Sequence, residues 1–333
     1  MPHEHLLIDS TRLLVEPNRF SKMPLVDAPV SIEILADLKR DIMISNDNLR
    51  LDDLNDAIAE LTRYKMFGGS SIVDVTVPGI GRDPLAIRAI STATDVNVVC
   101  ATGWYVDRTH PAYVKSKSVD ELAAIMMREL REGIDETGIR AGVIKIAFGG
   151  DPFTKNEKKV LEAAAQVQAE TGAPVDIHPA QYNIEKRVFS KTAGEYLNLM
   201  REERADLSKV YISHMEYTSS DLEYQKTLID EYGVTLAYDC FGQEYYSDSS
   251  SLGKGGFSDK QRVEALVKLL NAGHEKHLMV SNDICYKVKL RKYGGYGYAN
   301  ILEHIVPMLK FEGIIQKQIN AMLVENPKRI LSW

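Results

Sequence analysis

The chain has 333 residues, and its 44% hydrophobic and 26% charged content is that of an ordinary globular protein. The formal net charge of −7 leaves no basic excess for a phosphate backbone, so we expect no nucleic-acid partner. No apolar run approaches the roughly 20 residues of a membrane span and no leader pattern opens the chain, so we expect neither a membrane segment nor a signal peptide. The cysteines, Cys100, Cys240 and Cys285, are too far apart for a C-x-x-C pair, which favours a reducing cytoplasm.

Short apolar runs alternate with longer helical patterns along the whole chain. Most of the short runs are continuously apolar, as is typical of parallel strands covered by helices. The predicted strands, eight in all, are 3–9, 70–77, 96–103, 141–148, 173–178, 209–216, 234–241 and 277–283. A strand–helix unit repeated in this way predicts an α/β protein with a single (β/α)8 barrel domain over residues 1–333.

Several of the intervening helices have recognisable first residues. In a capping box, a Ser or Thr accepts from the amide three residues on, and a Glu or Gln reaches back to the cap. We predict such helix starts at Ser118, Thr154, Ser220 and Ser258. The Ser- and Gly-rich segment 245–259 follows the seventh predicted strand, so we expect it to form a lid on the catalytic face of the barrel.

Residues that can bind metal ions stand at five of the predicted strands. His3 and His5 are two apart in the first strand, where such residues share a face. The other four are Lys145 in the fourth strand, His178 and His214 at the fifth and sixth, and Asp283 at the eighth. Catalytic residues of a parallel barrel lie at the C-terminal ends of its strands. Each residue alone could be a core histidine, an internal ion-pair lysine or a helix cap, but their common placement favours a site.

The remaining histidines do not share this placement. His274 and His277 precede the eighth strand, at the opposite end of a barrel. Their spacing is one residue shorter than in the H-E-x-x-H zinc motif, so we expect them at the surface. We expect His304 to face solvent and His110 to serve the loop after the third strand.

The sequence resembles the phosphotriesterase family of the amidohydrolase superfamily over essentially its whole length. The resemblance is carried by HEHLLID, RAGVIKIAFGG, IHPA, ISHME, SNDICYK and ENPKRIL. The segments DCFGQE and DICYKVKLRKYGGYGYANI are most similar to the phosphotriesterase-related subgroup. This resemblance implies a barrel with a binuclear metal centre at the C-terminal ends of the strands, and a homodimer is a further expectation from it.

The resemblance assigns each candidate ligand to one of two metal ions. His3, His5 and Asp283 would bind the more buried ion, and His178 and His214 the more exposed one. Lys145, carbamylated by CO2, would bridge both, and burial in an apolar strand favours the neutral amine that this reaction needs. Imidazole and carboxylate ligands suit zinc, with manganese, cobalt or iron as alternatives.

The resemblance also implies catalytic roles. A hydroxide between the metal ions would be the nucleophile, and Asp283 would take its proton and pass it to the leaving group. Asp239, at the end of the seventh strand, would relay that proton or support the ligands, unless it only caps its loop. Tyr105 matches a tyrosine that hydrogen-bonds the substrate in lactonase relatives, which favours carbonyl substrates, unless it only packs at the rim.

We therefore predict a metal-dependent hydrolase of a small carboxylic ester or lactone. Asp239-Cys240 stands where quorum-lactone hydrolases carry Asp-Arg, which argues against acyl-homoserine lactones. An amidohydrolase of N-acyl amino or sulfonic acids is the main alternative, and phosphotriester cleavage would be a weak side activity. The alternative of another class is a catalytically silent, metal-free binding barrel, although such proteins usually lose a ligand.

A basic segment follows the eighth strand. Lys287, Lys289, Arg291 and Lys292 lie close together after Asp283. Because the rest of the chain is acidic, a cation near the pocket would attract an anionic substrate. We expect Lys287 to bind the charged group of a small-molecule substrate, unless the segment is a solvated turn.

Overall fold

The computed structural model describes residues 1–17, 19–183, 188–245 and 256–333. Within these ranges the central sheet has seven parallel strands, in the spatial order β11–β10–β9–β6–β5–β4–β3. Their bounds are β3 (Ser71–Asp74), β4 (Asn97–Gly103), β5 (Ala141–Ala147), β6 (Val175–His178), β9 (Val210–Ile212), β10 (Thr235–Tyr238) and β11 (Leu278–Val280). Seven of the eight predicted segments therefore contain a strand of this sheet, and each strand is shorter than predicted.

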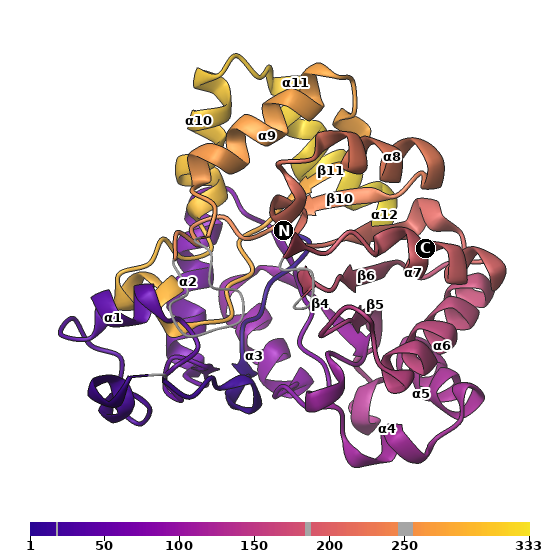
Figure 1. Ribbon diagram of the computed structural model, residues 1–333, viewed down its shortest axis with the longest axis horizontal. Helices are drawn as coiled ribbons and strands as arrows, with labels where there is room; N and C mark the ends of the chain where they lie inside the picture. Colours follow the sequence, from indigo (N-terminus) through magenta and orange to yellow (C-terminus); the bar gives the residue numbers. More distant parts are fainter. Residues whose placement is uncertain (18, 184–187, 246–255) are drawn as a thin grey trace.

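Helices surround the strands (Figure 1). Those that connect the strands or precede them are α2 (Leu54–Met66), α3 (Pro84–Thr94), α5 (Val119–Arg131), α6 (Lys155–Thr171), α7 (Ala193–Glu202), α8 (Leu222–Tyr232) and α9 (Asp259–Asn271). Shorter helices are α1 (Leu35–Arg40), α4 (Ala112–Ser116), α10 (Val306–Phe311), α11 (Gln316–Asn320) and α12 (Asn326–Leu331). One hydrophobic cluster includes buried residues from every strand of the sheet and from the helices that cover it. This packing fixes the strand ends, and with them the residues of the candidate site.

Three of the four predicted capping boxes are confirmed. Ser118, Thr154 and Ser258 each accept from the amide three residues on, and the Glu or Gln at that position reaches back to the cap. The box predicted at Ser220 is wrong. The side chain of the next residue, Asp221, accepts from Tyr224 N and caps α8, because an aspartate is as good a cap as a serine.

The first predicted strand, 3–9, is not a regular strand of the sheet. Within the described residues, its one parallel pairing is a single bridge between Glu4 and Asp74, the last residue of β3. Further along, β1 (Ile8–Asp9) pairs in the antiparallel sense with β2 (Arg50–Leu51). A second antiparallel pair is formed by β7 (Tyr182–Asn183) and β8 (Val188–Phe189). The expected eight-stranded sheet is therefore a curled sheet of seven, with the N-terminal segment at the remaining position.

On the side of the N-terminal segment that faces β11, side-chain hydrogen bonds take the place of a backbone ladder. Glu4 N donates to Val73 O of β3 at 3.0 Å. Towards β11, however, the carboxylate of Glu4 accepts from Ser281 Oγ at 2.6 Å, from Asn282 N at 2.7 Å and from Ile284 N at 3.0 Å. The segment thus contacts both edges of the sheet, and it brings the histidines that flank Glu4 to the strand ends.

Candidate metal centre

The six predicted metal ligands come together at the ends of the strands. Lys145 lies within β5 and His178 is the last residue of β6, while His214 and Asp283 follow β9 and β11. The N-terminal segment adds the remaining two histidines, and all six side chains are buried. All except Lys145 line a cavity of about 940 Å³.

The ring nitrogens of the histidines converge on one another and on a carboxylate. His3 Nε2 and His5 Nε2 each lie 3.5 Å from Asp283 Oδ1. His214 Nε2 lies 2.6 Å from His178 Nδ1. The ring centroids of His3 and His214 are 4.9 Å apart, which joins the two groups. We call these five residues the donor cluster.

Outer partners hold the ring nitrogens that point away from the cluster. His5 Nδ1 lies 2.8 Å from Thr76 Oγ1, and His214 Nδ1 lies 2.7 Å from Asp239 Oδ1. Metal-binding histidines typically use their second nitrogen in this way, because the outer partner fixes the orientation of the ring. The donor set therefore fits divalent metal ions that prefer imidazole and carboxylate ligands.

Asp176 belongs to the site but is absent from the sequence-based set. It precedes His178 by two residues on β6, so both side chains point to the same face of the sheet. Asp176 Oδ2 lies 2.9 Å from His3 Nδ1 and accepts from Lys145 Nζ at 2.7 Å, and its Oδ1 accepts from Ser213 Oγ. The period of two in VDIH is the signal that would have found it.

The surroundings of Lys145 are less apolar than its own strand suggests. The neighbours on β5 are buried hydrophobic residues, but the carboxylate of Asp176 faces the amine. The carbamate on Lys145 stays a prediction.

The charge states of two cluster members suit metal binding. Burial opposes ionisation of Asp283, but the hydrogen bond from His5 and the charge of His3 outweigh it and hold the pKa of this carboxyl well below its usual value. Burial, with the charge of His214 next, holds the pKa of His178 well below its usual value. An ionised carboxylate and a neutral imidazole are the forms that ligate metals.

The backbone at two of these residues is unusual. His214 has φ = +60° and Asp283 has φ = +49°. Both values lie in the left-handed region, which residues other than glycine rarely adopt. Such conformations cluster at functional sites, where the surrounding structure compensates their cost. At Asp283 the compensation includes Lys289, a residue without an assigned role in the sequence analysis, whose Nζ donates to the carbonyls of Asn282 and Asp283.

The two other predicted catalytic residues lie in different places. Tyr105 lines the cavity, and its ring centroid is 5.0 Å from that of His178. Asp239 lies behind His214, where its Oδ1 accepts from the ring and from the backbone amide, and its Oδ2 is 3.4 Å from His3 Nδ1. Its Oδ2 is buried and has no hydrogen-bond partner. Tyr105 thus lies on the cavity wall and Asp239 lies behind His214, and the roles expected for both stay predictions.

Lys287, the predicted substrate-binding cation, is engaged elsewhere. Its Nζ lies 2.5 Å from Asp47 Oδ1 and 3.6 Å from Asp52 Oδ1, and it is not among the residues that line the cavity. The segment around Asp47 packs on the loop after β11, where Lys287 N donates to Asn48 O. This arrangement does not support a role in substrate binding.

The remaining sequence-based expectations concern the loops and the other histidines. Of the predicted lid, 246–255 lies outside the described residues, while its flanks contribute Tyr245 and Phe257 to the cavity wall. His110 Nε2 contacts Tyr105 O within the loop after β4. His277 Nδ1 lies 2.9 Å from Val234 O, and the His304 side chain is 40% exposed, so neither joins the donor cluster.

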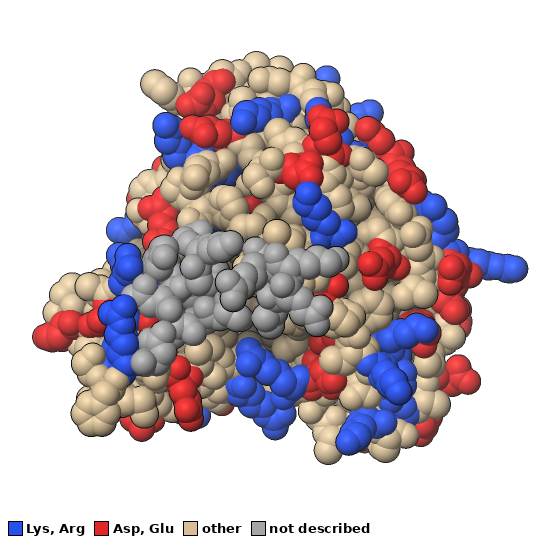
Figure 2. Space-filling view, viewed as in Figure 1, with Lys and Arg blue, Asp and Glu red and all other residues tan. Residues whose placement is uncertain are grey.

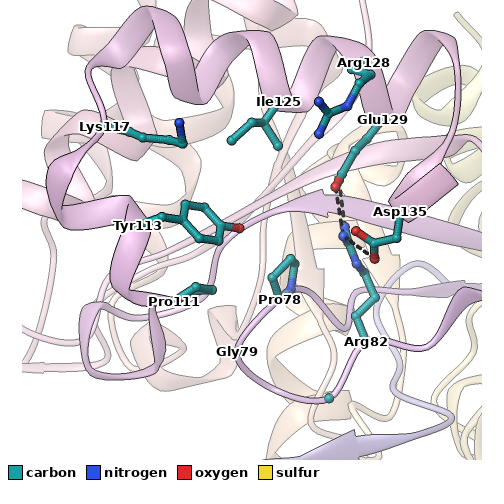
Figure 3. A pocket seen from close by; sticks show the side chains of 11 residues that line it. Pro78, Gly79, Arg82, Pro111, Tyr113, Lys117, Ile125, Arg128, Glu129 and Asp135 are labelled. Carbon is teal, nitrogen blue, oxygen red and sulfur yellow. Dashed lines mark hydrogen bonds and ion pairs between the residues drawn. The ribbon is translucent and has the colours of Figure 1, made fainter.

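Figure 3 shows a second cavity, of about 510 Å³, whose lining includes no residue of the donor cluster. Its charged wall is an internal ion-pair network, in which Arg82 donates to both carboxylate oxygens of Glu129 and to Asp135. Arg128 and Lys117 stand at its edge. Arg82 and Glu129 are buried and neutralise each other, so this network offers no unpaired buried acid or base for catalysis among the described residues.

The surface in Figure 2 shows Lys and Arg interspersed with Asp and Glu, without a broad field of one sign on the visible face. Among the described helices, none combines the length and the apolar character that crossing a bilayer requires.

The fold and the donor cluster together define an α/β protein whose parallel strand ends carry a candidate metal centre. The model of the phosphotriesterase family matches residues 1–331, and the chain belongs to this family. It is 36% identical to an N-acetyltaurine hydrolase from Salmo salar, over 100% of this chain and 93% of the relative. It is a hydrolase of the phosphotriesterase family.

Two solved structures show the same fold. A resiniferatoxin-binding protein from Rhodobacter sphaeroides superposes with a TM-score of 0.93 and 34% identity, covering 100% of this chain and 90% of that one. A mutant of a phosphotriesterase-like lactonase from Deinococcus radiodurans has a TM-score of 0.75 and 27% identity, covering 100% of this chain and 95% of that one.

Proposed function

We propose that the chain hydrolyses the amide bond of a small N-acylated amino sulfonic or amino carboxylic acid, with two divalent metal ions, zinc first among them. The observation that carries the metal-dependent chemistry is the convergence of four imidazoles and Asp283 at the wall of one cavity. The substrate class is supported by the relatives named N-acetyltaurine hydrolase, which match the full length of this chain.

The residues of the chain have distinct tasks in this reaction. Divalent metal ions, when bound, polarise the scissile carbonyl and make a coordinated water more acidic. Asp283 is ionised and its Oδ1 faces both N-terminal histidines, so it can hold the proton that the attacking water loses. An amine leaves readily only when protonated, and the same carboxyl can deliver that proton. Tyr105 stands beside His178, where its hydroxyl can donate to the carbonyl oxygen.

Lactone or ester hydrolysis is the second candidate. It is favoured by the place of Tyr105 on the cavity wall and by the similarity to the Deinococcus radiodurans lactonase. The chemistry at the carbonyl is the same in both cases, and only the leaving group differs. An alkoxide leaves more easily than an amine, so an amide hydrolase with this site is expected to open activated lactones as well.

A hydrolysis panel on metal-loaded protein tests the proposal. The panel contains N-acetyltaurine, N-acetyl-β-alanine, a δ-lactone and a nitrophenyl phosphotriester. We expect the two amides to have the highest kcat/KM, and His178→Ala to abolish turnover, while His304→Ala, outside the cluster, leaves it unchanged. Turnover of the lactone alone would replace the proposal with the second candidate, and no turnover of any substrate would refute both.

A further inference from the structure

The cavity has few charged side chains besides the donor cluster. Among the described lining residues these are Asp107, Arg108, Glu157 and Arg262. The carboxylates of Asp107 and Glu157 already accept hydrogen bonds from neighbouring protein groups. Glu157 accepts from Gly149 N at 2.9 Å and from Asp107 N at 3.1 Å, and Asp107 Oδ1 accepts from Asn156 Nδ2 at 3.0 Å.

The guanidinium of Arg262 is also paired with groups of the protein. Its Nη1 lies 2.9 Å from Asp259 Oδ1, its Nε lies 3.3 Å from Glu216 Oε1, and its Nη2 donates to Gln243 O. The side chain is 2% exposed, so this charge is enclosed and balanced by two carboxylates. A substrate anion would have to displace one of them to reach it.

Arg108 differs from these three residues. It lies in the short 3-10 turn Asp107–Thr109 that follows β4, it is exposed, and it lines the cavity. Within the described part of the chain it has no hydrogen-bond or ion-pair partner. Tyr105, three residues earlier in the same loop, lines the same cavity.

We infer that Arg108 binds the anionic end of the substrate, a sulfonate or carboxylate, while the acyl end lies at the donor cluster. The inference rests on the proposed function for the identity of the substrate. A guanidinium matches two oxygens of such an anion in a bidentate contact. The contact matters because the chain carries a net charge of −7, which would otherwise repel a small anion.

Kinetics of a matched substrate pair test the inference. N-acetyltaurine is compared with the neutral analogue in which a primary sulfonamide replaces the sulfonate. Arg108→Ala should raise KM for the sulfonate by about 10- to 100-fold, the contribution of a hydrogen bond to a charged group, and leave kcat and the KM of the neutral analogue nearly unchanged. Arg108→Lys should restore part of the affinity. Equal effects on both substrates would overturn the inference.

The control is Arg128→Ala, which removes an exposed arginine that lines the second cavity instead (Figure 3). It should leave both substrates unaffected. Added salt should raise KM for N-acetyltaurine in the wild type and in Arg128→Ala but much less in Arg108→Ala, because salt screens an exposed charge pair. An identical salt dependence in all three proteins would contradict the assignment.

A binding measurement separates this inference from the proposed function. Taurine, the sulfonate-bearing product, is titrated into each protein by calorimetry, which needs no turnover. Weaker binding to Arg108→Ala than to Arg128→Ala supports the inference even if no amide is hydrolysed, in which case only the proposed function fails. Equal binding to both variants, or no binding to the wild type, overturns the inference whatever the kinetics show.

Discussion

Lys145 Nζ and Asp176 Oδ2 lie 2.7 Å apart, and both residues are fully buried between neighbouring strands. The ion pair places an anionic oxygen against the amine that would react with CO2. Asp176 also contacts His3 and Ser213, so it retains other partners if the amine changes. A Lys145 that bridges two metal ions would therefore have Asp176 as its neighbour, and Asp176 is absent from the ligand set predicted from the sequence.

The first prediction concerns Lys145. Lys145→Ala should abolish activity and lower metal content, because it removes the bridging anion, and added short carboxylates should restore some of both. Metal analysis and kcat/KM provide the measurement, and 13C NMR with labelled bicarbonate should show a carbamate in the wild type only. Lys260→Ala, on the exposed face of α9, is the control. A Lys145→Ala protein with full activity and a full metal complement would exclude the bridge.

Asp176→Asn is the second prediction. The amide keeps the shape of the side chain but loses the charge that faces His3 and Lys145. Loss of such an outer partner costs roughly 10- to 100-fold in metal affinity, so we expect a loss of this size in chelator competition. Asp230→Asn, at an exposed position, should have no effect. Unchanged metal affinity would reduce Asp176 to a structural ion pair.

The sequence alone predicted those features that depend on residues close together in the chain. The runs that contain β5 and β6 are apolar, and His178 ends its run, so its place at a strand end follows from the chain alone. Asp176 was not predicted because it is a single charged residue within the apolar run that contains β6, and nothing near it in the sequence links it to Lys145. The contact between them joins two strands, and only the register of β5 and β6 brings them together.

Two expectations differ from what the structure shows, and in both cases the reason is contact between distant parts of the chain. Lys287 was expected at the substrate, but Asp47 lies 240 positions earlier and neutralises it. The first segment was expected to be a strand because it is a short apolar run, yet towards β11 the side chain of Glu4 makes the hydrogen bonds that a backbone ladder would make. Neither partner can be identified without the folded arrangement of both segments.

Asp283→Asn is the third prediction. The variant keeps a ligand oxygen but loses the proton acceptor, so kcat should fall by roughly 10²- to 10⁴-fold, the usual contribution of a general base. KM and metal content should change much less, which separates this effect from ligand loss. Steady-state kinetics and metal analysis on the same preparation provide the measurement. An unchanged kcat would remove Asp283 from proton transfer.

Tyr105→Phe is the fourth prediction. The ring should still pack beside His178, but the hydrogen bond to the substrate is lost, at a cost of about 1–3 kcal/mol in kcat/KM. Amide and lactone substrates, which share the carbonyl, should be affected more than a phosphotriester. Tyr113→Phe, on the wall of the second cavity, is the matched control (Figure 3). A uniform effect on all substrate classes would indicate a packing role.

The last prediction concerns Glu4, which joins the N-terminal segment to the end of β11. Its carboxylate accepts from two backbone amides, those of Asn282 and Ile284, at a fully buried position. Glu4→Ala leaves both amides without their acceptor, and at roughly 1–3 kcal/mol for each we expect a loss of about 2–6 kcal/mol in the free energy of unfolding.

Glu4→Gln should fall between the wild type and Glu4→Ala in urea unfolding. The glutamine side chain has one acceptor oxygen, and its NH2 group is a donor that would face the other backbone N–H. It can therefore accept from only one of the two backbone amides. Glu312→Ala, at an exposed position, should leave the unfolding free energy unchanged. Because the histidines that flank Glu4 belong to the donor cluster, its loss should also weaken metal binding in parallel with stability. If Glu4→Ala is as stable as Glu312→Ala, the segment is held by its pairing with β3 alone, and the side-chain closure of the sheet contributes nothing.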